Sequence, residues 1–338
     1  MTVSTEAPAP SASPPRRRPG VNFHVLGPLL ALILLVVLGA LLNDQFLSSG
    51  NISNVLARSS FIGIIAVGAT FVITTGGIDL SVGSMAAFIA GSMILAINYL
   101  LAGMGAGWPL VLVGMAVGLG LGLISGAVNG LLTTRGRIEA FIVTLGTMGI
   151  FRALVTWLAN GGTISLNFEV GDIYRPVYYG GVAGITWPII VFALVAIIGE
   201  VVMRRTAFGR HCSAIGSNEQ VARYSAIHVD NVRLLTYVLQ GALVGVATLL
   251  YVPRLGSASS ATGVLWELEA IAAVIIGGTT LKGGYGRVWG TVIGVVILSL
   301  IDNILNLTDV VSPYLNGAFQ GVIIILAVLL QRSRKGER

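Results

Sequence analysis

The sequence predicts an all-α integral membrane protein with about ten transmembrane helices, and three observations lead to that fold class. Only 10% of the 338 residues are charged and 55% are hydrophobic, whereas a soluble domain carries about 25% charged residues. The mean hydropathy is +0.88. Charge-free runs recur along the chain, and each offers the roughly 20 apolar residues that a spanning helix needs. This composition excludes a cytosolic enzyme, a disordered protein and a nucleic-acid binder.

The charge-free runs give the spans in order. Any single run would also fit a buried core helix, but the repetition of the pattern rules this out for the set. The long run 80–134 has room for two spans with a turn at Gly103 to Pro109. We expect spans over residues 25–42, 59–76, 84–102, 108–133, 140–159, 187–203, 234–252, 268–281, 288–307 and 316–331.

The distribution of Lys and Arg gives the orientation, because cytoplasmic loops are enriched in both. With the N-terminus inside, most of the 20 Lys and Arg residues fall on the inner face. The outer face then receives only Arg58, Arg175 and Arg254, so we expect both termini in the cytoplasm. The outer loop 160–186 holds several aromatic residues, among them Tyr174, which suit an interfacial belt.

Four regions follow from these assignments. Residues 1–22 are rich in Ala, Pro and Ser and should form a disordered cytoplasmic tail. Residues 23–331 form the transmembrane domain, and its inner loop 204–233 is the most polar stretch after the tail. Residues 332–338 form a basic cytoplasmic tail.

The segment Gly76–Ser84 reads GGIDLSVGS and interrupts two apolar runs. Non-helical backbone at membrane depth is tolerated only where it is buried in protein or lines a wet cavity. Asp79 is a functional candidate there, or alternatively a cap for the next helix. The hydroxyl groups that precede the break, at Thr70, Thr74 and Thr75, favour a polar pathway.

The segment Glu267–Gly290 reads ELEAIAAVIIGGTTLKGGYGRVWG, and its apolar part is too short for a full span. A short, glycine-broken span is typical of a discontinuous helix. The pattern of apolar helix, glycine-rich break and apolar helix echoes the first break and hints at an internal repeat. No G-x-x-x-x-G-K-[ST] motif occurs in the chain, so we expect no phosphate-binding loop of that kind.

The inner loop contains Ser217 and Gln220, which fit a capping box for a short helix. Val221, Ala222 and Tyr224 would form the apolar side of that helix. Such a helix either docks on a cytosolic partner or lies on the lipid surface with its flanking arginines on anionic headgroups.

Two further polar features fall within spans. Arg152 lies midway in the fifth span, where an unpaired guanidinium is costly, so it needs carbonyls, a carboxylate or water. We expect it to be a structural anchor rather than a substrate contact. Asp302, Asn303 and Asn306 share one face of the ninth span and either line the pathway or mark a helix end at the interface.

Catalytic and metal-binding patterns are missing from the sequence. There is a single cysteine, Cys212, and no H-E-x-x-H or G-x-S-x-G motif. We therefore expect neither an enzyme nor a metal site.

Three stretches carry the motifs of a known family. Thr74–Ser84 match T-x-GGIDLSVGS nearly letter for letter, Thr206–Ile227 follow the family's cytoplasmic loop, and Glu267–Thr291 follow its third motif with Glu269 in place of Asp. On these residues the chain resembles the membrane-spanning permeases of bacterial sugar ABC importers, of the ribose/xylose/galactose type, from about residue 50 to residue 331. The inner loop departs at Ala226, where the family prefers Gly, and at Val221.

The resemblance implies a division of labour in the bacterial inner membrane. Two permease subunits, identical or paralogous, form the pathway, and a cytosolic ATPase, often a fused double one, binds ATP and Mg and docks on loop 204–233. An extracytoplasmic binding protein delivers the sugar. This chain itself would bind no cofactor. The implied coupling residues are Phe208, Gly209, Arg210, Gly216, Ser217, Asn218, Glu219 and Ala222.

The remaining candidates fall into two groups. For a neutral polyol, hydroxyl and amide groups are suitable partners, and the expected pathway residues are Thr70, Thr74, Asp79, Ser81, Asn129, Asn303 and Asn306. The expected structural or gating residues are Gly76, Gly77, Gly83, Arg152, Glu267, Glu269, Gly283, Gly284 and Arg287.

Two alternatives stay open. A self-sufficient secondary transporter would need a coupling-ion site, for which Asp79 with Asp302 is the only start. A related permease for branched-chain amino acids differs only in cargo, and the GGIDLSVGS motif favours the sugar branch.

Overall fold

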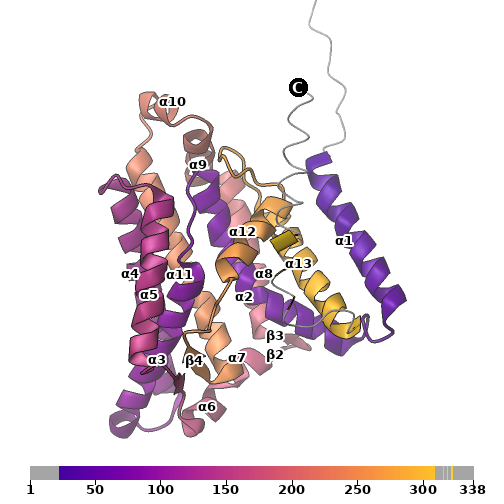
Figure 1. Ribbon diagram of the computed structural model, residues 1–338, viewed down its shortest axis with the longest axis vertical. Coiled ribbons are helices and arrows are strands. Elements are labelled where there is room, and N and C mark those ends of the chain that lie inside the picture. The colour runs from indigo at the N-terminus through magenta and orange to yellow at the C-terminus, as the bar shows by residue number, and fades with distance from the viewer. Residues whose placement is uncertain (1–22, 309–314, 316–317, 319–320, 323–338) are drawn as a thin grey trace, which may run out of the picture.

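A computed structural model describes residues 23–308 and positions 315, 318, 321 and 322. Every predicted span within 23–308 corresponds to a helix (Figure 1). These helices are α1 (Phe23–Leu42), α2 (Ser49–Thr74), α3 (Val82–Met104), α4 (Trp108–Thr134), α5 (Ala140–Leu158), α8 (Trp187–Arg205), α11 (Val229–Leu255), α12 (Trp266–Ile276) and α13 (Val288–Thr308).

Among the described residues, seven helices are long and apolar enough to cross a membrane. Helix α1 has 20 residues, and its described apolar stretch runs from Gly27 to Leu42. Helix α12 has 11 residues, which span only about 16 Å at 1.5 Å per residue. The prediction of a short, discontinuous helix is thus confirmed, although α12 begins two residues earlier and ends five residues earlier than the predicted span 268–281. The tenth predicted span and both predicted tails lie almost wholly outside the described residues.

Helix α2 begins ten residues before the predicted span. The prediction treats Arg58 as a residue outside the helix, whereas Arg58 lies on an exposed face within it. The hydroxyl of Ser48 caps this start by accepting a hydrogen bond from the Asn51 amide at 3.3 Å. From Ser59 to Thr74 nearly every residue is buried. Helix α2 is therefore the centre of the fold.

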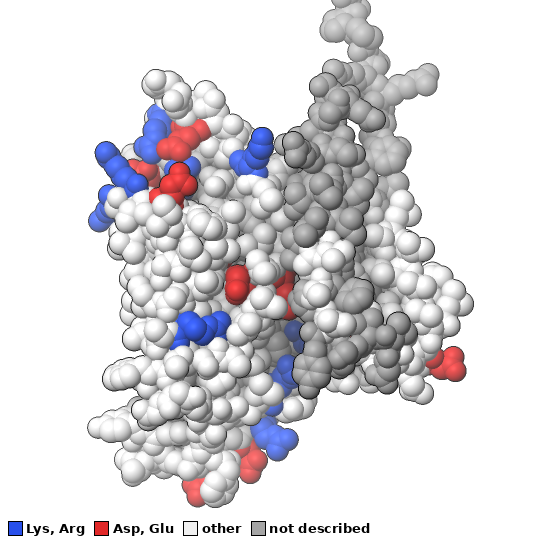
Figure 2. Space-filling model, viewed as in Figure 1, with Lys and Arg blue, Asp and Glu red and all other residues white. Residues whose placement is uncertain are grey.

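Short elements gather at two opposite ends of the bundle. Helices α9 (Ala207–Ser217) and α10 (Glu219–Tyr224) lie at one end, as Figure 1 shows. The other end holds the short elements of the predicted outer loop and the strand that pairs with it. Figure 2 shows charged side chains at both ends, and only a few on the broad face between them. The elements of the second end are β1 (Thr163–Ser165), α6 (Phe168–Tyr174), α7 (Pro176–Tyr179), β2 (Gly181–Val182), β3 (Ile185–Thr186) and β4 (Ser257–Ser259).

The outer loop is folded against the bundle. Strand β1 pairs with β4 in antiparallel register, with Ile164 opposite Ala258, so the loop after α5 is joined to the chain that leaves α11. Tyr174 is completely buried, and its hydroxyl donates a 2.7 Å hydrogen bond to the Leu249 carbonyl. The expectation that Tyr174 belongs to an interfacial belt is therefore wrong, because its hydroxyl has a partner inside the protein.

Helices α4 and α11 pack along a seam of glycines. A Cβ atom on Gly122 would overlap the Gly241 carbonyl, and one on Gly126 would overlap the Tyr237 carbonyl. Gly241 meets the backbone of both Gly122 and Gly126. Small residues let two backbones approach this closely in a membrane protein, so the two helices form one tightly packed pair.

Candidate functional site

The first helix break follows α2 directly. Helix α2 ends at Thr74, and Gly76 takes a φ of 85°, a backbone region that glycine enters without the steric cost of a Cβ. Beside it, a Cβ on Gly77 would lie 2.7 Å from the Tyr237 hydroxyl. The chain then runs without helix to Ser81, before α3 begins at Val82.

The second break, after α12, touches the first. Gly283 and Gly284 have φ values of 81° and 84°, again in the region that favours glycine. The Gly284 amide donates a 2.9 Å hydrogen bond to the carbonyl of Thr74, the last residue of α2. Gly283 lies against the Gly76 amide. The two breaks that the sequence shows as similar patterns are therefore neighbours in space.

Gly216, near the end of α9, fits between these breaks. A Cβ atom on this residue would overlap the Thr74 carbonyl oxygen and the Gly284 amide nitrogen. Ser217 follows it and lies against Gly284. We call the set Thr74, Gly76, Gly216, Gly283 and Gly284 the three-way junction. It joins the inner loop to both helix breaks by backbone contact.

Helix α9 is also fixed to α2 through side chains. The ring of Phe208 stacks on that of Phe71, with 5.8 Å between centroids. Gly209 lies against the backbone of Met203, at the end of α8, and admits no side chain. Arg210 is exposed. Cys212 is buried, and this burial raises the pKa of its thiol to about 12.

Helix α10 begins at Asn218, not through the predicted capping box. The Asn218 side chain accepts the Val221 amide at 3.1 Å, whereas the Ser217 hydroxyl donates backwards to the Ser213 carbonyl at 2.8 Å. An Asn cap satisfies the free amides of the first turn as well as Ser would. The capping-box prediction is wrong because α9 runs through Ser217.

The apolar side chains of α10 mostly face away from the protein. Ala222 is buried, but Val221 is 57% exposed and Tyr224 90% exposed. An exposed tyrosine beside an exposed valine is more typical of an interaction surface than of a core. Of the three residues predicted to form the apolar side of this helix, only Ala222 is therefore buried against the protein.

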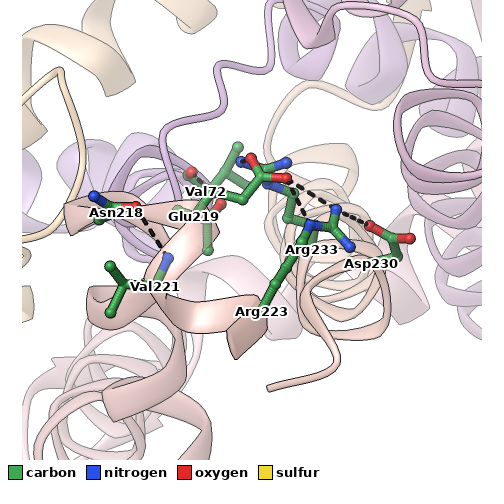
Figure 3. A network of polar contacts seen from close by, with 8 residues as sticks. Val72, Asn218, Glu219, Val221, Arg223, Asp230 and Arg233 are labelled. Atoms are coloured by element: carbon green, nitrogen blue, oxygen red, sulfur yellow. Dashed lines mark hydrogen bonds and ion pairs between the residues drawn. The ribbon is translucent and has the colours of Figure 1, made fainter. Parts of the chain in front are cut away.

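Ion pairs fasten α10 to the start of α11 (Figure 3). Glu219 pairs with Arg223 at 2.9 Å and with Arg233 at 2.8 Å, and Arg223 pairs with Asp230 at 2.8 Å. Partial burial raises the pKa of Glu219, but the hydrogen bonds and charges of the two arginines outweigh this, so its pKa is lower than usual. The network therefore stays ionised at neutral pH, and its contribution to stability is lost only as the pH falls through that lowered pKa.

Ala226 has a φ of 59°. This left-handed conformation costs an L-residue roughly 1–2 kcal/mol compared with glycine. The family motif leads us to expect Gly at this position. The left-handed backbone at Ala226 is a conformation that glycine adopts without this cost.

Most of the predicted pathway residues use their polar groups inside the protein. The Thr70 and Thr291 hydroxyls share a 2.7 Å hydrogen bond, and the Thr74 hydroxyl donates to the Thr70 carbonyl at 2.5 Å. Asn303 exchanges two amide hydrogen bonds with Asn51, at 2.8 and 2.9 Å. Asn306 is exposed.

Asp79 does not cap α3 with its side chain. The residue at the helix start is Ser81, which makes no side-chain cap. Asp79 instead accepts the Ser81 amide at 2.9 Å and the Ser81 hydroxyl at 2.6 Å, and Asn129 donates to that hydroxyl at 2.8 Å. These three predicted pathway residues are therefore one buried cluster.

Arg152 anchors the chain between β4 and α12. Its guanidinium donates to the carbonyls of Ser260 and Thr262, at 2.5 and 2.6 Å. Glu267, in the first turn of α12, lies near enough for its charge to act on Arg152. Gly83 packs so closely on Gly263 and Glu267 that it admits no side chain. The guanidinium therefore has carbonyl partners within the protein, and its role as a structural anchor stays a prediction.

The outward side of α5 near Arg152 is hollowed. A shallow cavity of about 680 Å³ is lined by residues of α5 and the loop that follows. Its polar lining comes from Arg152, Thr156 and Asn160, with Trp157 beside them. Of these four residues only Arg152 could be singled out from the sequence, because a Thr, an Asn and a Trp near a helix end form no pattern.

Replacing Arg152 with leucine should lower the thermal stability of the chain and reduce transport, since two partly buried carbonyls lose their donor, at about 1–3 kcal/mol for each group left unpaired. Lysine at this position should restore part of the loss, because it keeps the charge but not the forked donor. Thermal unfolding in detergent measures the effect. Arg254→Leu is the control, because Arg254 makes a contact with a Tyr178 ring rather than with carbonyls. Equal losses in both variants would contradict the anchor.

Glu200 is a structural residue that sequence reasoning missed. It is 8% exposed, and its Oε2 atom accepts the amides of Val288 and Trp289 at 3.1 and 3.2 Å, at the start of α13. Its other oxygen lies 3.5 Å from Arg204. A carboxylate suits a helix N-terminus because the free amides point toward it. In a sequence, an acid near the end of a span looks like an ordinary interfacial residue, so no signal could have found it.

The other predicted structural residues lie in or beside the second break. The Arg287 amide donates to the Thr279 hydroxyl at 3.2 Å, and its carbonyl accepts the Thr291 hydroxyl at 3.1 Å. Glu269 is partly buried on α12. Among the residues that the structure describes, no three His, Cys, Asp or Glu side chains gather as a metal site.

A multi-pass membrane bundle with two broken helices that meet beside an inner loop defines a transport protein of the membrane. Residues 51–328 match the family model described as "Branched-chain amino acid transport system / permease component". The chain therefore belongs to this family of permease components. It is a multi-pass protein of the bacterial inner membrane.

Named relatives match over nearly their whole length. The ribose import permease protein RbsC of Bacillus subtilis is 41% identical, over 91% of this chain and 93% of its own. That of Haemophilus influenzae is 38% identical, over 89% and 90%. The xylose transport system permease protein XylH of Escherichia coli is 32% identical, over 93% of each chain. A solved ABC transporter chain of metal-chelate type, inward-facing, aligns with a TM-score of 0.49 and 15% identity over 92% of this chain and 97% of its own, a likeness too distant to carry an argument.

Proposed function

We propose that the chain is the permease subunit of an ATP-driven importer for a monosaccharide or related polyol. The observation that carries this is the three-way junction, where the end of the inner loop meets both helix breaks by backbone contact. High-coverage relatives that carry the names of ribose and xylose permeases support the cargo class. The chain acts as a transport subunit, and ATP and Mg would be bound by a separate cytosolic ATPase.

The mechanism is alternating access driven from α10. A docked ATPase would hold the exposed side chains of Val221 and Tyr224 and move α10 when it closes on ATP. The ion pairs of Glu219 would pass that movement to α11, and Gly216 would pass it to the ends of α2 and α12. Because the contacts of Gly216 are between backbones, little of the movement is absorbed by side-chain rotation.

The orientation follows from the same assignment. The end that carries α9 and α10 would face the cytoplasm, with both termini on that side. The opposite end, with β1, α6, α7 and β4, would receive the extracytoplasmic binding protein. A second permease subunit, identical or paralogous, would complete the pathway.

The sugar would pass along the open side of α5. The hydroxyls of Thr70 and Thr74 are used in internal hydrogen bonds, so we assign them to the packing of α2. Asn160 remains at the cavity, with Trp157, and offers a neutral polyol amide partners. Thr156 also lines the cavity, but its hydroxyl donates a 2.7 Å hydrogen bond to the Arg152 carbonyl and has only acceptor capacity left. Weak contacts suffice there if the binding protein supplies the affinity.

Exchanging Tyr224 for aspartate should reduce the ATPase that copurifies with the chain at least tenfold, because large aromatic side chains dominate such interfaces and about 1.4 kcal/mol corresponds to tenfold. Affinity purification from the native membrane, with quantitative mass spectrometry, measures it. Phe168→Asp is the matched control, since Phe168 is an aromatic residue that is 76% exposed at the start of α6, in the outer loop. A permease that retains its ATPase with Asp at 224 would overturn the docking assignment.

The alternative of a self-sufficient transporter receives no support from the relatives, which carry permease names. Uptake of sugar by the purified chain in liposomes without ATP would favour it. A strict requirement for the copurified ATPase and ATP supports the importer.

A further inference from the structure

The three arginines expected on the outer face lie around one pair of tyrosines. The guanidinium carbon of Arg254 is 5.8 Å from the ring centre of Tyr178. That of Arg175 is 5.6 Å from the ring centre of Tyr179. Burial raises the pKa of Tyr178, and the charges of Arg254 and Arg58 act against that rise, so Arg58 is also near this ring. These residues come from α2, α11 and the segment at α7, so the fold brings them together.

Two of the three guanidiniums have no acidic partner within the described part of the protein. Arg175 lies 4.0 Å from Asp172, and both side chains are largely exposed. Among the residues that the structure describes, Arg58 and Arg254 have no carboxylate within 4.0 Å. A contact with an aromatic ring orients a guanidinium but does not neutralise it. The arginines therefore suit an acidic partner, because complementary charges steer two protein surfaces together and align them.

The surface beside these arginines is hollowed. A cavity of about 370 Å³ is lined by α6 and by the end of α11, and its charged residues are Asp172, Arg175 and Arg254. A protruding side chain of a partner can enter such a hollow. Figure 1 shows α6 and α7 at the end of the bundle that lies opposite α9 and α10. The arginines are therefore placed where a protein outside the membrane can reach them.

A chain of aromatic contacts leads from the tyrosine pair to α12. The Tyr178 ring stacks on that of Phe61, with 5.9 Å between ring centres. Phe61 meets Tyr251 edge to face at 5.5 Å, and Tyr251 meets Trp266 edge to face at 5.0 Å. Trp266 is the first residue of α12, the helix that leads into the second break. Because packed interiors are poorly compressible and transmit strain, a displacement of the first ring reaches the last.

We propose that Arg58, Arg175 and Arg254 form a docking surface for an acidic face of the extracytoplasmic binding protein, and that the aromatic chain passes this contact to α12. The inference rests on the proposed function, to which it adds the residues and the charge of the outer contact. Carboxylates of the partner would pair with Arg58 and Arg254, and would compete with Asp172 for Arg175. The rings would then act on α12 at the end opposite to its glycine break.

Titration of the binding protein onto the importer measures the docking. The permease and its ATPase are reconstituted in phosphatidylcholine nanodiscs, and the probe is the binding protein of the same importer, labelled with a fluorophore. The triple variant Arg58→Gln, Arg175→Gln, Arg254→Gln should weaken binding at least tenfold at low salt, and less at high salt, where charges are screened. Lysine at the same three positions should retain most of the affinity, and Asp172→Asn should increase it. Unchanged binding in the glutamine variant would overturn the proposal.

A cross-linking experiment identifies the chemistry of the partner. Arg254→Lys keeps the charge and supplies an amine, which a water-soluble carbodiimide couples to a neighbouring carboxylate as an amide. We expect a cross-linked peptide that joins position 254 to an Asp or Glu of the binding protein. Suppose instead that no such peptide forms, and that the glutamine variant differs from the unmodified chain only in thermal stability in phosphatidylglycerol nanodiscs. The arginines would then bind lipid headgroups, and the proposal would be wrong.

Phe61→Leu separates docking from its transmission, because it removes one ring of the aromatic chain. This variant should bind the labelled protein normally but lose most of the stimulation of ATP hydrolysis that the binding protein produces. Phe192→Leu is the matched control, since Phe192 is also buried, at 7% exposed, and forms no aromatic pair among the described residues. Equal stimulation in the two variants would remove the aromatic chain from the proposal.

Failure of this docking surface is distinguishable from failure of the proposed function. A permease that needs its ATPase and ATP for uptake, but whose glutamine variant still docks the binding protein or which needs no binding protein, keeps the function and loses the surface. Uptake by the purified chain without an ATPase removes the function itself.

Discussion

Replacing Gly216 with alanine is expected to abolish ATP-driven transport. The added Cβ would overlap backbone atoms of Thr74 and Gly284 at the same time, and neither can move aside as a flexible side chain would. Overpacking costs about 1–3 kcal/mol where side chains can give way, and here the backbone of two helix breaks must shift. We expect at least a tenfold loss of ATP-dependent sugar uptake in proteoliposomes with the ATPase and binding protein present.

The matched control for this variant is Gly120→Ala. Gly120 is also a helical glycine, but nothing lies within 4 Å of the position of its Cβ. Alanine there should be neutral or should stabilise the helix by up to about 1 kcal/mol, because alanine has the higher helix propensity. If Gly216→Ala transports like Gly120→Ala, the three-way junction does not carry the coupling.

A separate readout distinguishes coupling from folding at Gly216. If the variant still retains its ATPase on affinity purification and still hydrolyses ATP, yet moves no sugar, the junction transmits the movement of α10. If the ATPase is lost as well, the variant has disturbed α9 itself. Either result differs from that of Tyr224→Asp, which leaves the junction intact.

Replacing Glu200 with alanine should destabilise the chain by several kcal/mol. Two amides at the start of α13 would lose a charged acceptor in a buried place, and each such loss costs about 1–3 kcal/mol. We expect a lower unfolding temperature and a reduced yield of folded protein, measured by thermal unfolding in detergent and by size-exclusion chromatography. Glutamine should restore part of the stability, since it keeps one acceptor oxygen without the charge.

Glu169→Ala is the control for this effect. Glu169 is also an acid in the first turn of a helix, α6, but it is exposed. Its removal should change the unfolding temperature little, because a dipole interaction at an exposed site is worth about 0.3–1 kcal/mol. A similar loss in both variants would show that Glu200 acts as a general helix-end charge and not as a buried clamp between α8 and α13.

The membrane helices could be predicted from the sequence because hydropathy reports burial in lipid directly. Each predicted span within residues 23–308 has its helix, and the short, broken α12 was visible in the distance between its charged start and its glycines. The start of α2 could not be predicted, because a sequence does not distinguish an arginine on an exposed helix face, such as Arg58, from an arginine at a helix end. The folded outer loop also escaped, because the pairing of β1 with β4 joins residues about a hundred positions apart.

The candidate site could be predicted by residue type better than by arrangement. The glycines of all three motifs were singled out, but only the structure shows that Gly216 meets both breaks. Thr70 and Thr74 looked like pathway residues because a hydroxyl's partner cannot be read from the sequence. Glu200 could not be predicted because its partners are backbone amides. Every residue except proline has a backbone amide, so the sequence does not indicate where such a partner lies.

The glycine seam between α4 and α11 has a consequence for how the chain opens. Two helices whose backbones touch cannot slide without breaking contact along their length, so their amides should be among the last in the molecule to exchange hydrogen with solvent. The amides of α12 and its flanking glycines, where one short helix lies between two turns, should exchange earlier. A map of exchange rates would then divide the chain into a stationary frame, built on α4 and α11, and a moving part that carries the second break.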